Sequence, residues 1–393
     1  MVEIMAWLTN WLTNRITNRL TNRIGLVVSA TLLGQILPVS IPDSEPNNYL
    51  SYFSTAIAQT QLSTDSVNKE VSPPTSLRNP PPPTRPLPDQ RLRQETQPLP
   101  ADFRVSALQP DFTGELWVGS WLGLTRIDPN TGKIRTRLSL PNYTVGAITQ
   151  DRVGRIWVGT YEGLLRIDPR NNEINAQNYT LPSNNVLSLL IDTRGYLWVG
   201  SDRGLALISP DQGLLMTTLQ KLPGVSANAL TLDEEGQLWV GTLEGLVRVD
   251  TASAFVIARI KDLPGNTVQT LTRGPEGMLW AGTPNSLLVI NPDTYEVFRS
   301  VTPLRGRNVT AVQFDLDGNV WVGTDNGLFK IKRDSGEVLA KLGKLPSSRI
   351  LALAPNTGNK LWIGTSEGLA WVSMTTGRIE PHLGFVREIP GSF

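Results

Sequence analysis

The chain has 393 residues, of which 40% are hydrophobic and 18% are charged, so it is long enough to bury a sizeable core. Its formal net charge of +1 gives no electrostatic case for binding nucleic acid, which usually requires a basic face. Cysteine is absent and His382 is the single histidine, which excludes disulfides, thiolate metal sites and a histidine cluster for zinc. We expect His382 on the surface of the last strand, and we expect no metal and no cofactor.

Residues 1–58 contain the basic repeat "WLTNWLTNRITNRLTNR" at 7–23, which is followed by an uncharged stretch from Ile24 to Pro42. A basic region followed by an apolar one is typical of a secretory signal, and a helix that spans a membrane needs roughly 20 apolar residues. This segment is predicted to be a signal peptide, cleaved after "AIA" at 56–58, or a signal anchor that tethers the chain to a membrane. The protein would then be exported, and it would be periplasmic, on the cell surface or membrane-anchored and facing outward. The alternative is a cytosolic amphipathic helix.

Residues 59–100 contain the run "NPPPPTRPLPDQ" and are predicted to form a disordered, proline-rich linker, because proline fixes φ and removes a hydrogen-bond donor. Near its end, "RLRQET" at 91–96 aligns with fourth strands of the repeats that follow, such as "KIRTRL" at 133–138. It is a candidate outer strand that helps to close a ring, alongside "RIEPHL" at 378–383.

Residues 101–393 consist of repeats. The segment "GQLWVGTLEGLVRVD" at 236–250 recurs as "GRIWVGTYEGLLRID" at 154–168 and as "GNVWVGTDNGLFKIK" at 318–332. A fixed period between 20 and 50 residues indicates a repeat architecture. The first interval between the repeated tryptophans is 40 positions and each later one is 41, and these residues are Trp117, Trp157, Trp198, Trp239, Trp280, Trp321 and Trp362.

Each period holds four short strand runs and no room for a helix of ten residues. In the fourth repeat the runs are "SANALTLD", "QLWVGT", "LVRVD" and "FVIARI", and short runs separated by turns with Gly, Asp, Asn and Pro are typical of hairpins. Four antiparallel strands in about 40 residues are typical of a propeller blade. The sequence therefore predicts an all-β protein, a seven-bladed β-propeller of four-stranded antiparallel blades. A β-solenoid is the alternative.

Three recurring positions have predicted packing roles. The tryptophan of each repeat is expected to fill the gap between neighbouring blades. The glycine two residues later should let backbones approach closely. A small residue on the first strand should face the crowded central axis, and these residues are Ala107, Ala147, Ser188, Ala229, Thr270, Ala311 and Ala352.

The pattern "D-x-x-G-x-L-W-V-G-T-x-x-G-L-x-R-I-D" resembles the two-component regulator propeller repeat. It is found at 151–168, 192–209, 233–250 and 315–332, with changes at its end. In that family such repeats build the extracytoplasmic sensor propellers of hybrid histidine kinases, so the resemblance implies a propeller with a sensing role. We take the Asp of the pattern to be replaced by Pro110, Gly274 and Pro355 in repeats one, five and seven, and the turn Gly by Ser286 in repeat five.

Candidate binding residues lie in the loops that vary between repeats. In a propeller, the loops between strands two and three and between strand four and the next blade open on the same face, and exposed aromatic rings beside charged groups suit a peptide or a glycan. The candidates are Trp121, Tyr143, Tyr161, Glu162, Asp202, Arg203, Glu244, Arg307, Asp325 and Arg349. We expect the ligand over blades one to three, off the central axis. The alternatives are a merely solvated rim, or a site on the opposite face with its loops such as "DPNTG".

The favoured function is an extracytoplasmic ligand- or protein-binding propeller that acts as a sensor-like or scaffold module. Its expected partner is a glycan, a peptide or another envelope protein, with no nucleic acid, and the propeller is expected to be a monomer. The alternative is a carbohydrate-active propeller enzyme, a lyase or glycoside hydrolase, that uses the carboxylates of the loop face. A glycoside hydrolase needs two carboxylates at a set separation, and a lyase that relies on histidine and a metal would have only His382.

Overall fold

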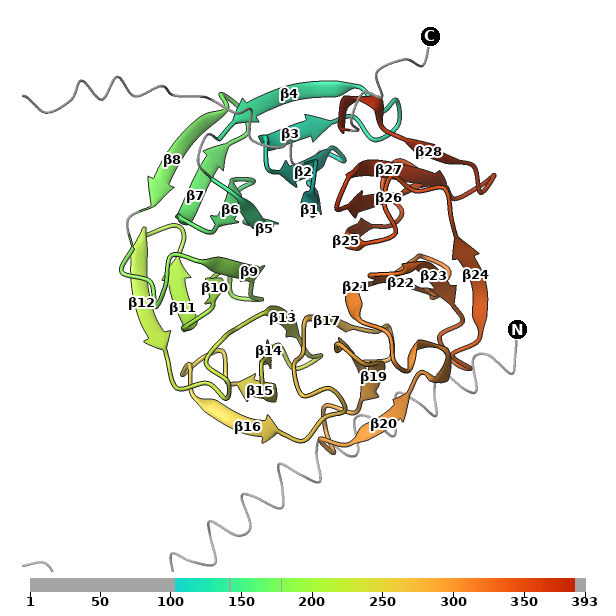
Figure 1. Ribbon diagram of the computed structural model, residues 1–393. Helices are drawn as coiled ribbons and strands as arrows, with labels where there is room; N and C mark the ends of the chain where they lie inside the picture. The colour runs from blue at the N-terminus through green and yellow to red at the C-terminus, as the bar shows by residue number, and fades with distance from the viewer. Residues whose placement is uncertain (1–102, 141–142, 178, 386–393) are drawn as a thin grey trace, which may run out of the picture. The chain divides into compact units, whose positions relative to one another are not determined.

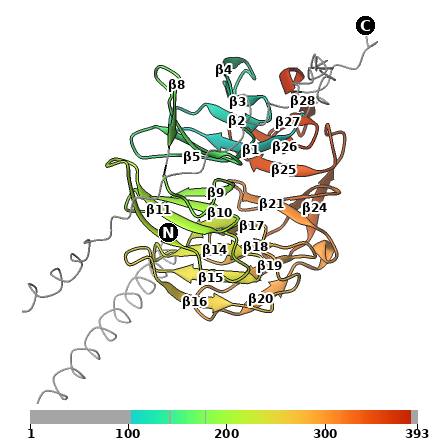
Figure 2. The same cartoon turned by 60° about the vertical axis from the view of Figure 1, so that its left-hand side comes forward.

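The computed structural model describes residues 103–140, 143–177 and 179–385. These residues form seven four-stranded antiparallel sheets, each built from four strands that are consecutive in the sequence. The sheets form a ring of blades in which the first strand of each lies next to the axis and the fourth lies on the rim (Figures 1 and 2). The predicted seven-bladed propeller is confirmed. The predicted signal segment 1–58, the linker 59–100 and the strand candidate 91–96 lie outside the described residues.

The strands follow the repeats closely. Blades one to three comprise β1 (Val105–Pro110), β2 (Leu116–Ser120), β3 (Gly123–Ile127), β4 (Ile134–Ser139), β5 (Val145–Gln150), β6 (Ile156–Thr160), β7 (Gly163–Asp168), β8 (Glu173–Gln177), β9 (Val186–Ile191), β10 (Leu197–Ser201), β11 (Gly204–Ser209) and β12 (Leu214–Leu219). Blades four and five comprise β13 (Ala229–Leu232), β14 (Leu238–Thr242), β15 (Gly245–Val249), β16 (Val256–Ile260), β17 (Thr270–Arg273), β18 (Leu279–Gly282), β19 (Leu287–Ile290) and β20 (Val297–Ser300). Blades six and seven comprise β21 (Val309–Phe314), β22 (Val320–Thr324), β23 (Gly327–Ile331), β24 (Val338–Leu342), β25 (Ile350–Ala354), β26 (Lys360–Thr365), β27 (Gly368–Ser373) and β28 (Ile379–Pro381). The helical segments among the described residues are two 3-10 turns, η1 (Thr302–Leu304) and η2 (Leu383–Phe385), and no helix there is long and apolar enough to cross a bilayer.

The repeated tryptophans pack each blade against the next one. Trp239 of blade four is fully buried in a cluster with Val268 and Leu279 of blade five. Trp362 of the last blade is buried in the same way against Val105 and Leu116 of the first. Every seam of the ring therefore has its own apolar core, as the repeat predicted, and burial of large aromatic side chains accounts for much of the stability of such a core.

A buried aspartate holds five of the seven repeated tryptophans. In blade two, Asp151 accepts hydrogen bonds at Oδ1 from the backbone N–H groups of Val153 (3.1 Å) and Arg155 (2.9 Å). Its Oδ2 accepts the indole N–H of Trp157 at 2.8 Å. A carboxylate can be buried only when its oxygens are hydrogen-bonded in this way. The same Asp–Trp bond, at 3.0 to 3.1 Å, occurs at Asp111, Asp192, Asp233 and Asp315.

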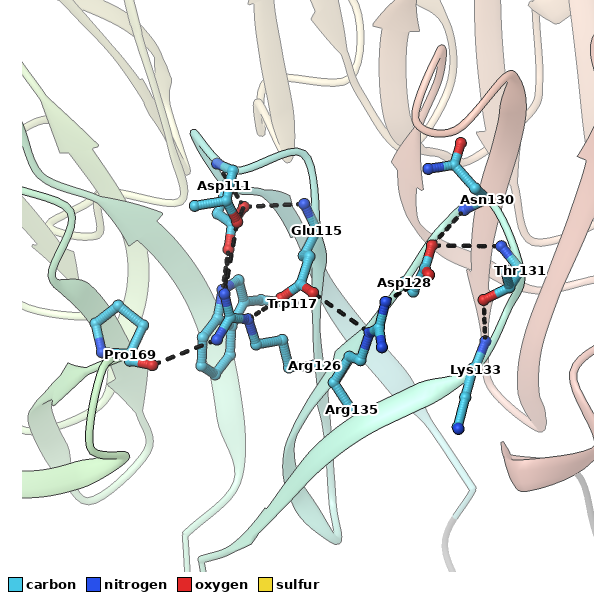
Figure 3. Close-up of polar contacts among 11 residues, drawn as sticks. Asp111, Glu115, Trp117, Arg126, Asp128, Asn130, Thr131, Lys133, Arg135 and Pro169 are labelled. Carbon is cyan, nitrogen blue, oxygen red and sulfur yellow. Dashed lines mark hydrogen bonds and ion pairs between the residues drawn. The ribbon is translucent and has the colours of Figure 1, made fainter.

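The first blade corrects one sequence prediction. Pro110 does not replace the aspartate of repeat one, because Asp111 stands six residues before Trp117, as in the other repeats, and accepts its indole N–H (Figure 3). The departures at the other two repeats are confirmed. Gly274 leaves repeat five without a carboxylate, and in repeat seven the backbone carbonyl of Thr357 accepts the indole N–H of Trp362 at 3.0 Å.

The innermost strands surround a central channel with a cavity of about 270 Å³, which is lined by residues of all seven blades. The predicted small residues line it: Ala107, Ala147, Ser188, Ala229, Thr270, Ala311 and Ala352. The glycine after each tryptophan faces the first strand of the next blade. At Gly364, for example, a Cβ atom would lie 2.5 Å from the carbonyl oxygen of Val105, so only glycine lets blade seven approach blade one this closely.

Direct contacts between blades seven and one close the ring. Lys360 donates hydrogen bonds to the carbonyl oxygens of Pro129 (2.6 Å) and Asn130 (2.7 Å). Burial lowers the pKa of Lys360, and the opposing effect of Asp128 is smaller. His382 is not the surface residue that the sequence suggested. It is half-buried just after β28, and its Nε2 lies 2.7 Å from the carbonyl oxygen of Gly132.

The first prediction concerns the packing of the blades. Replacing Trp239 by Ala should lower the free energy of unfolding by about 3 to 5 kcal/mol, because the surrounding seam cannot fully collapse into the cavity. Chemical denaturation measures the loss. The matched control is Phe255→Ala, an aromatic residue of the same repeat that is 72% exposed, for which a change within about 0.5 kcal/mol is expected. A loss below about 1 kcal/mol for Trp239→Ala would contradict its role in the seam.

The second prediction concerns ring closure. Lys360→Met should destabilise the propeller by about 1 to 3 kcal/mol, because two carbonyl oxygens of blade one lose their donor. Lys341→Met is the control, since Lys341 is exposed and contacts the ring of Phe329 of its own blade. Equal midpoints of urea unfolding for the two variants would show that the Lys360 contacts do not help to close the ring.

Candidate functional site

The varied loops come together on one face of the ring, as predicted. The turn between strands two and three lies beside the loop that enters the same blade. In blade two the backbone N–H of Tyr161 donates to the carbonyl oxygen of Thr144 at 3.1 Å. In blade six the N–H of Asp325 donates to the carbonyl oxygen of Asn308 at 3.3 Å. We call this side of the ring the loop face.

The three predicted aromatic residues differ in how far they are available to a ligand. Tyr161, in the turn after β6, is 48% exposed. A Cβ atom on Gly146, which lines the channel, would lie 3.4 Å from its ring, so Tyr161 stands at the channel wall. Trp121 is half-buried in the turn after β2. Tyr143 packs against the core between blades one and two. Tyr161 therefore offers the largest open aromatic surface of the three.

Two of the predicted charged side chains form no hydrogen bond or ion pair with other described residues. Arg203 and Glu244 are exposed, and among the described residues no side chain or backbone group pairs with either side chain. Glu162 is also exposed, but its Oε2 accepts the backbone N–H of Thr144 at 3.1 Å, which helps to shape the loop.

Other predicted residues hold their own loops. Asp202 accepts the side-chain amide of Asn185 at 3.5 Å, and Asp325 accepts that of Asn308 at 2.5 Å. Arg349 is exposed and forms an ion pair with Asp325 at 3.5 Å. Within the described part of the chain, no other ion pair joins two members of the predicted set. The structure thus spreads the four predicted carboxylates over blades two, three, four and six instead of gathering them.

Arg307 is engaged with the protein itself. Its guanidinium lies over the ring of Phe329 at 5.0 Å, and its Nε donates to the carbonyl oxygen of Pro303 at 3.2 Å. Both contacts fix the loop after η1, and they leave the guanidinium partly available at the face.

The opposite face contains a cavity of about 550 Å³ between blades one and two, which the residue predictions did not include. Phe112 and Val153 form its apolar edge, at 72% and 54% exposure. Its walls include the guanidinium groups of Arg126, Arg155 and Arg170. One feature of the sequence could have indicated this cavity. Phe112 directly follows the aspartate of the repeat, a position where large apolar residues are otherwise rare.

Ion pairs occupy two of these three arginines. Arg126 contacts Glu115 and donates to the carbonyl oxygen of Pro169 at 3.3 Å (Figure 3). Arg155 pairs with the carboxylates of Asp151 (2.5 Å) and Asp211 (2.6 Å).

These pairs also set the charge of the cavity. Burial lowers the pKa of Arg155, but the two carboxylates raise it by more, so this guanidinium stays charged. Arg170 is exposed, and within the described ranges its guanidinium has no partner. The cavity therefore offers an open phenyl ring beside one free cation.

Among the described residues, no three His, Asp or Glu side chains lie close enough together to hold a metal ion. The buried aspartates of the repeats are fully used by the indole and backbone N–H groups.

Comparisons with known proteins agree with this fold. Residues 139–162 and 180–203 match the family model described as two component regulator propeller. The extracellular domain of the hybrid two component system BT3049 from B. thetaiotaomicron has a similar structure, with a TM-score of 0.60 and 21% identity over 69% of this chain and 40% of that chain. The extracellular domain of BT4673 from the same organism gives a TM-score of 0.59 and 19% identity over 68% and 40%. No curated protein matches the chain.

A propeller enzyme shares the fold more distantly. Virginiamycin B lyase from Staphylococcus aureus gives a TM-score of 0.51 and 19% identity over 62% of this chain and 84% of that chain. At such identities the likeness to solved structures establishes the fold alone, and the chain spans 40% of the length of the two extracellular domains. Its repeats at residues 139–162 and 180–203 are of the two-component regulator propeller type, in agreement with the resemblance drawn from the sequence.

Proposed function

We propose that this propeller is an outward-facing binding module of the sensor type, which recognises a glycan, a peptide or another envelope protein on its loop face. One observation carries the proposal: the aspartates that recur in five blades are fully hydrogen-bonded within those blades, whereas the loop face varies from blade to blade. The buried Asp233, for example, gives one oxygen to the indole of Trp239 and the other to backbone N–H groups. Recognition is therefore assigned to the varied loops.

The binding surface proposed here extends over blades one to three. Tyr161 provides an open ring at the channel wall, Trp121 lies in the corresponding turn of blade one, and the free guanidinium of Arg203 follows in blade three. Aromatic rings give a flat contact area at low entropic cost, and a guanidinium fits a carboxylate of the ligand. Such a surface suits a sugar chain or an extended peptide.

Sensing is favoured over catalysis. A histidine-to-alanine variant of the S. aureus lyase, solved with quinupristin, is catalytically inactive. In this chain the single histidine, His382, is tied to the seam between blades seven and one, where Gly132 and Gly384 use both ring nitrogens. The matching repeats and the extracellular domains that share the fold point in the same direction.

A second candidate surface has a specific observation in its favour. The cavity between blades one and two on the opposite face is concave and joins the exposed ring of Phe112 to the free guanidinium of Arg170. Concave sites with a few placed polar groups are the usual location of small ligands. An anionic ligand with an apolar portion would fit there.

The third prediction concerns the loop face. A glycan and peptide array probed with the full chain identifies the ligand, and calorimetry then measures its affinity. Trp121→Ala combined with Tyr161→Ala should weaken binding by more than about 2 kcal/mol, because the two rings supply the aromatic contact area of the proposed surface. The melting temperature should change little, since neither residue lies in a blade seam.

The control is Phe112→Ala combined with Arg170→Ala, which alters the cavity of the opposite face. If this second variant loses the ligand while the first binds within twofold of the wild type, the site is the cavity and the loop-face proposal is wrong. Release of reducing sugar or unsaturated product from any glycan on the array would instead support the enzymatic alternative.

A further inference from the structure

Blade five lacks the carboxylate that five other blades place under their tryptophan. In those blades the Asp Oδ2 accepts the indole N–H at 2.8 to 3.1 Å. In blade five the position belongs to Gly274, and a Cβ atom there would lie 3.0 Å from Nε1 of Trp280. Within the described ranges this indole N–H has no acceptor. The side chain of Trp280 is nevertheless 98% buried, since its relative exposure is 2%.

In other blades, a basic side chain pairs with this carboxylate and lies near the tryptophan ring, and blade five also has such a basic side chain. In blade four Arg248 lies over the ring of Trp239 at 5.7 Å, and its Nε donates to Asp233 at 2.9 Å. Blade six pairs Lys330 with Asp315 at 3.0 Å in the same manner.

Blade five supplies the cation from another strand. Arg299 of β20 lies over the ring of Trp280 at 5.5 Å. Its terminal nitrogens donate to the backbone carbonyls of Arg333 and Asp334, whereas its Nε is buried and has no hydrogen-bond partner among the described residues. Blade five therefore keeps the indole donor and the guanidinium donor and loses only the acceptor between them.

A cavity of about 200 Å³ occupies this place. It is lined by Gly274, Trp280 and Arg299, with Phe298 at its edge and 71% exposed. The acids at its rim, Glu276 and Asp334, are both paired with Arg333, at 3.0 and 2.9 Å. Burying an N–H group without an acceptor costs about 1 to 3 kcal/mol, and Arg299 Nε is such a buried donor. Trp280, whose indole N–H also has no acceptor in the described ranges, lines the same cavity, so the pair of donors indicates a missing partner.

We propose that this cavity binds the carboxylate group of an external ligand, which accepts hydrogen bonds from Trp280 Nε1 and Arg299 Nε in place of the absent aspartate. The site lies on the face opposite to the proposed loop-face surface, and it goes beyond the proposed function. The ligand class is a carboxylic acid, such as a uronic acid of a glycan or an acidic peptide side chain. Charge-assisted hydrogen bonds from a guanidinium make a carboxylate the preferred acceptor.

The fourth prediction tests this site by NMR on the full chain with 15N-labelled indole groups. Acetate, added at an ionic strength matched with sodium chloride, should shift the indole N–H resonance of Trp280 in a saturable manner. The tryptophans already bonded to aspartate should not move. Trp280→Phe assigns the resonance. Glucuronate and N-acetyl-aspartate amide then distinguish a sugar acid from a peptide carboxylate as the natural source.

Two variants and a control decide the outcome. Gly274→Asp places an internal carboxylate in the cavity, so the Trp280 resonance should be shifted before acetate is added and should not respond to it. Because a side chain at 274 would also come within 3.1 Å of Phe314, Arg299→Gln provides a test that leaves this packing intact. It should weaken acetate binding at least about tenfold, whereas Arg259→Gln, on the exposed rim, should not.

Three results would overturn the proposal. The first is no saturable shift in the wild type, which would mean that Gly274 merely makes room for Phe314, whose ring meets that of Trp280 edge-on at 5.5 Å. The second is equal acetate affinity in Gly274→Asp and the wild type. The third is an equal response to chloride, which would show an anion site without preference for a carboxylate.

Discussion

The hydrogen bond between a buried aspartate and the indole N–H of its tryptophan is the interaction on which the rest of the structure depends. A tryptophan large enough to fill the seam between two blades carries a donor that must be satisfied when it is buried. The aspartate six residues earlier accepts that donor and, with its other oxygen, fixes the turn between the first two strands, as Asp151 does for Trp157. One side chain therefore shapes the turn, orients the indole and sets the packing distance to the next blade.

This arrangement explains why so much of the sequence is repeated. It also explains why the repeated residues do not select a ligand. Tryptophan, aspartate and the close-approach glycine are used inside the scaffold, and residues such as Gly364 tolerate no side chain because the next blade lies against them. The positions free to vary are the turns and loops at the two faces. Specific chemistry can arise there in two ways: from side chains added on the loop face, such as Tyr161, or from a repeated side chain removed, as at Gly274.

The ring closes without exchange of a strand between its ends in the described part of the chain, because each sheet consists of four strands of one repeat. Closure depends instead on the seam between blades seven and one. There the buried Trp362 packs on Val105, and Lys360 reaches two carbonyl oxygens of the first blade. These contacts join residues more than 200 positions apart, so no local pattern in the sequence predicts them.

The sequence by itself determined the fold, since a tryptophan every 40 or 41 residues with four strand runs in each period permits few architectures other than a seven-bladed ring. It also located the loop face, because the order of strands in a blade dictates which loops share a side. Tertiary structure decided the rest. It placed Asp111 rather than Pro110 under Trp117, drew His382 into the closing seam, and used Asp202, Asp325 and Arg307 within their own loops. It also formed cavities between blades, where side chains distant in the sequence meet. The physical reason is that the repeat in the sequence reflects local preferences for turns and for packing within a blade. The hydrogen-bond partners and the burial of a side chain depend on which blades become neighbours.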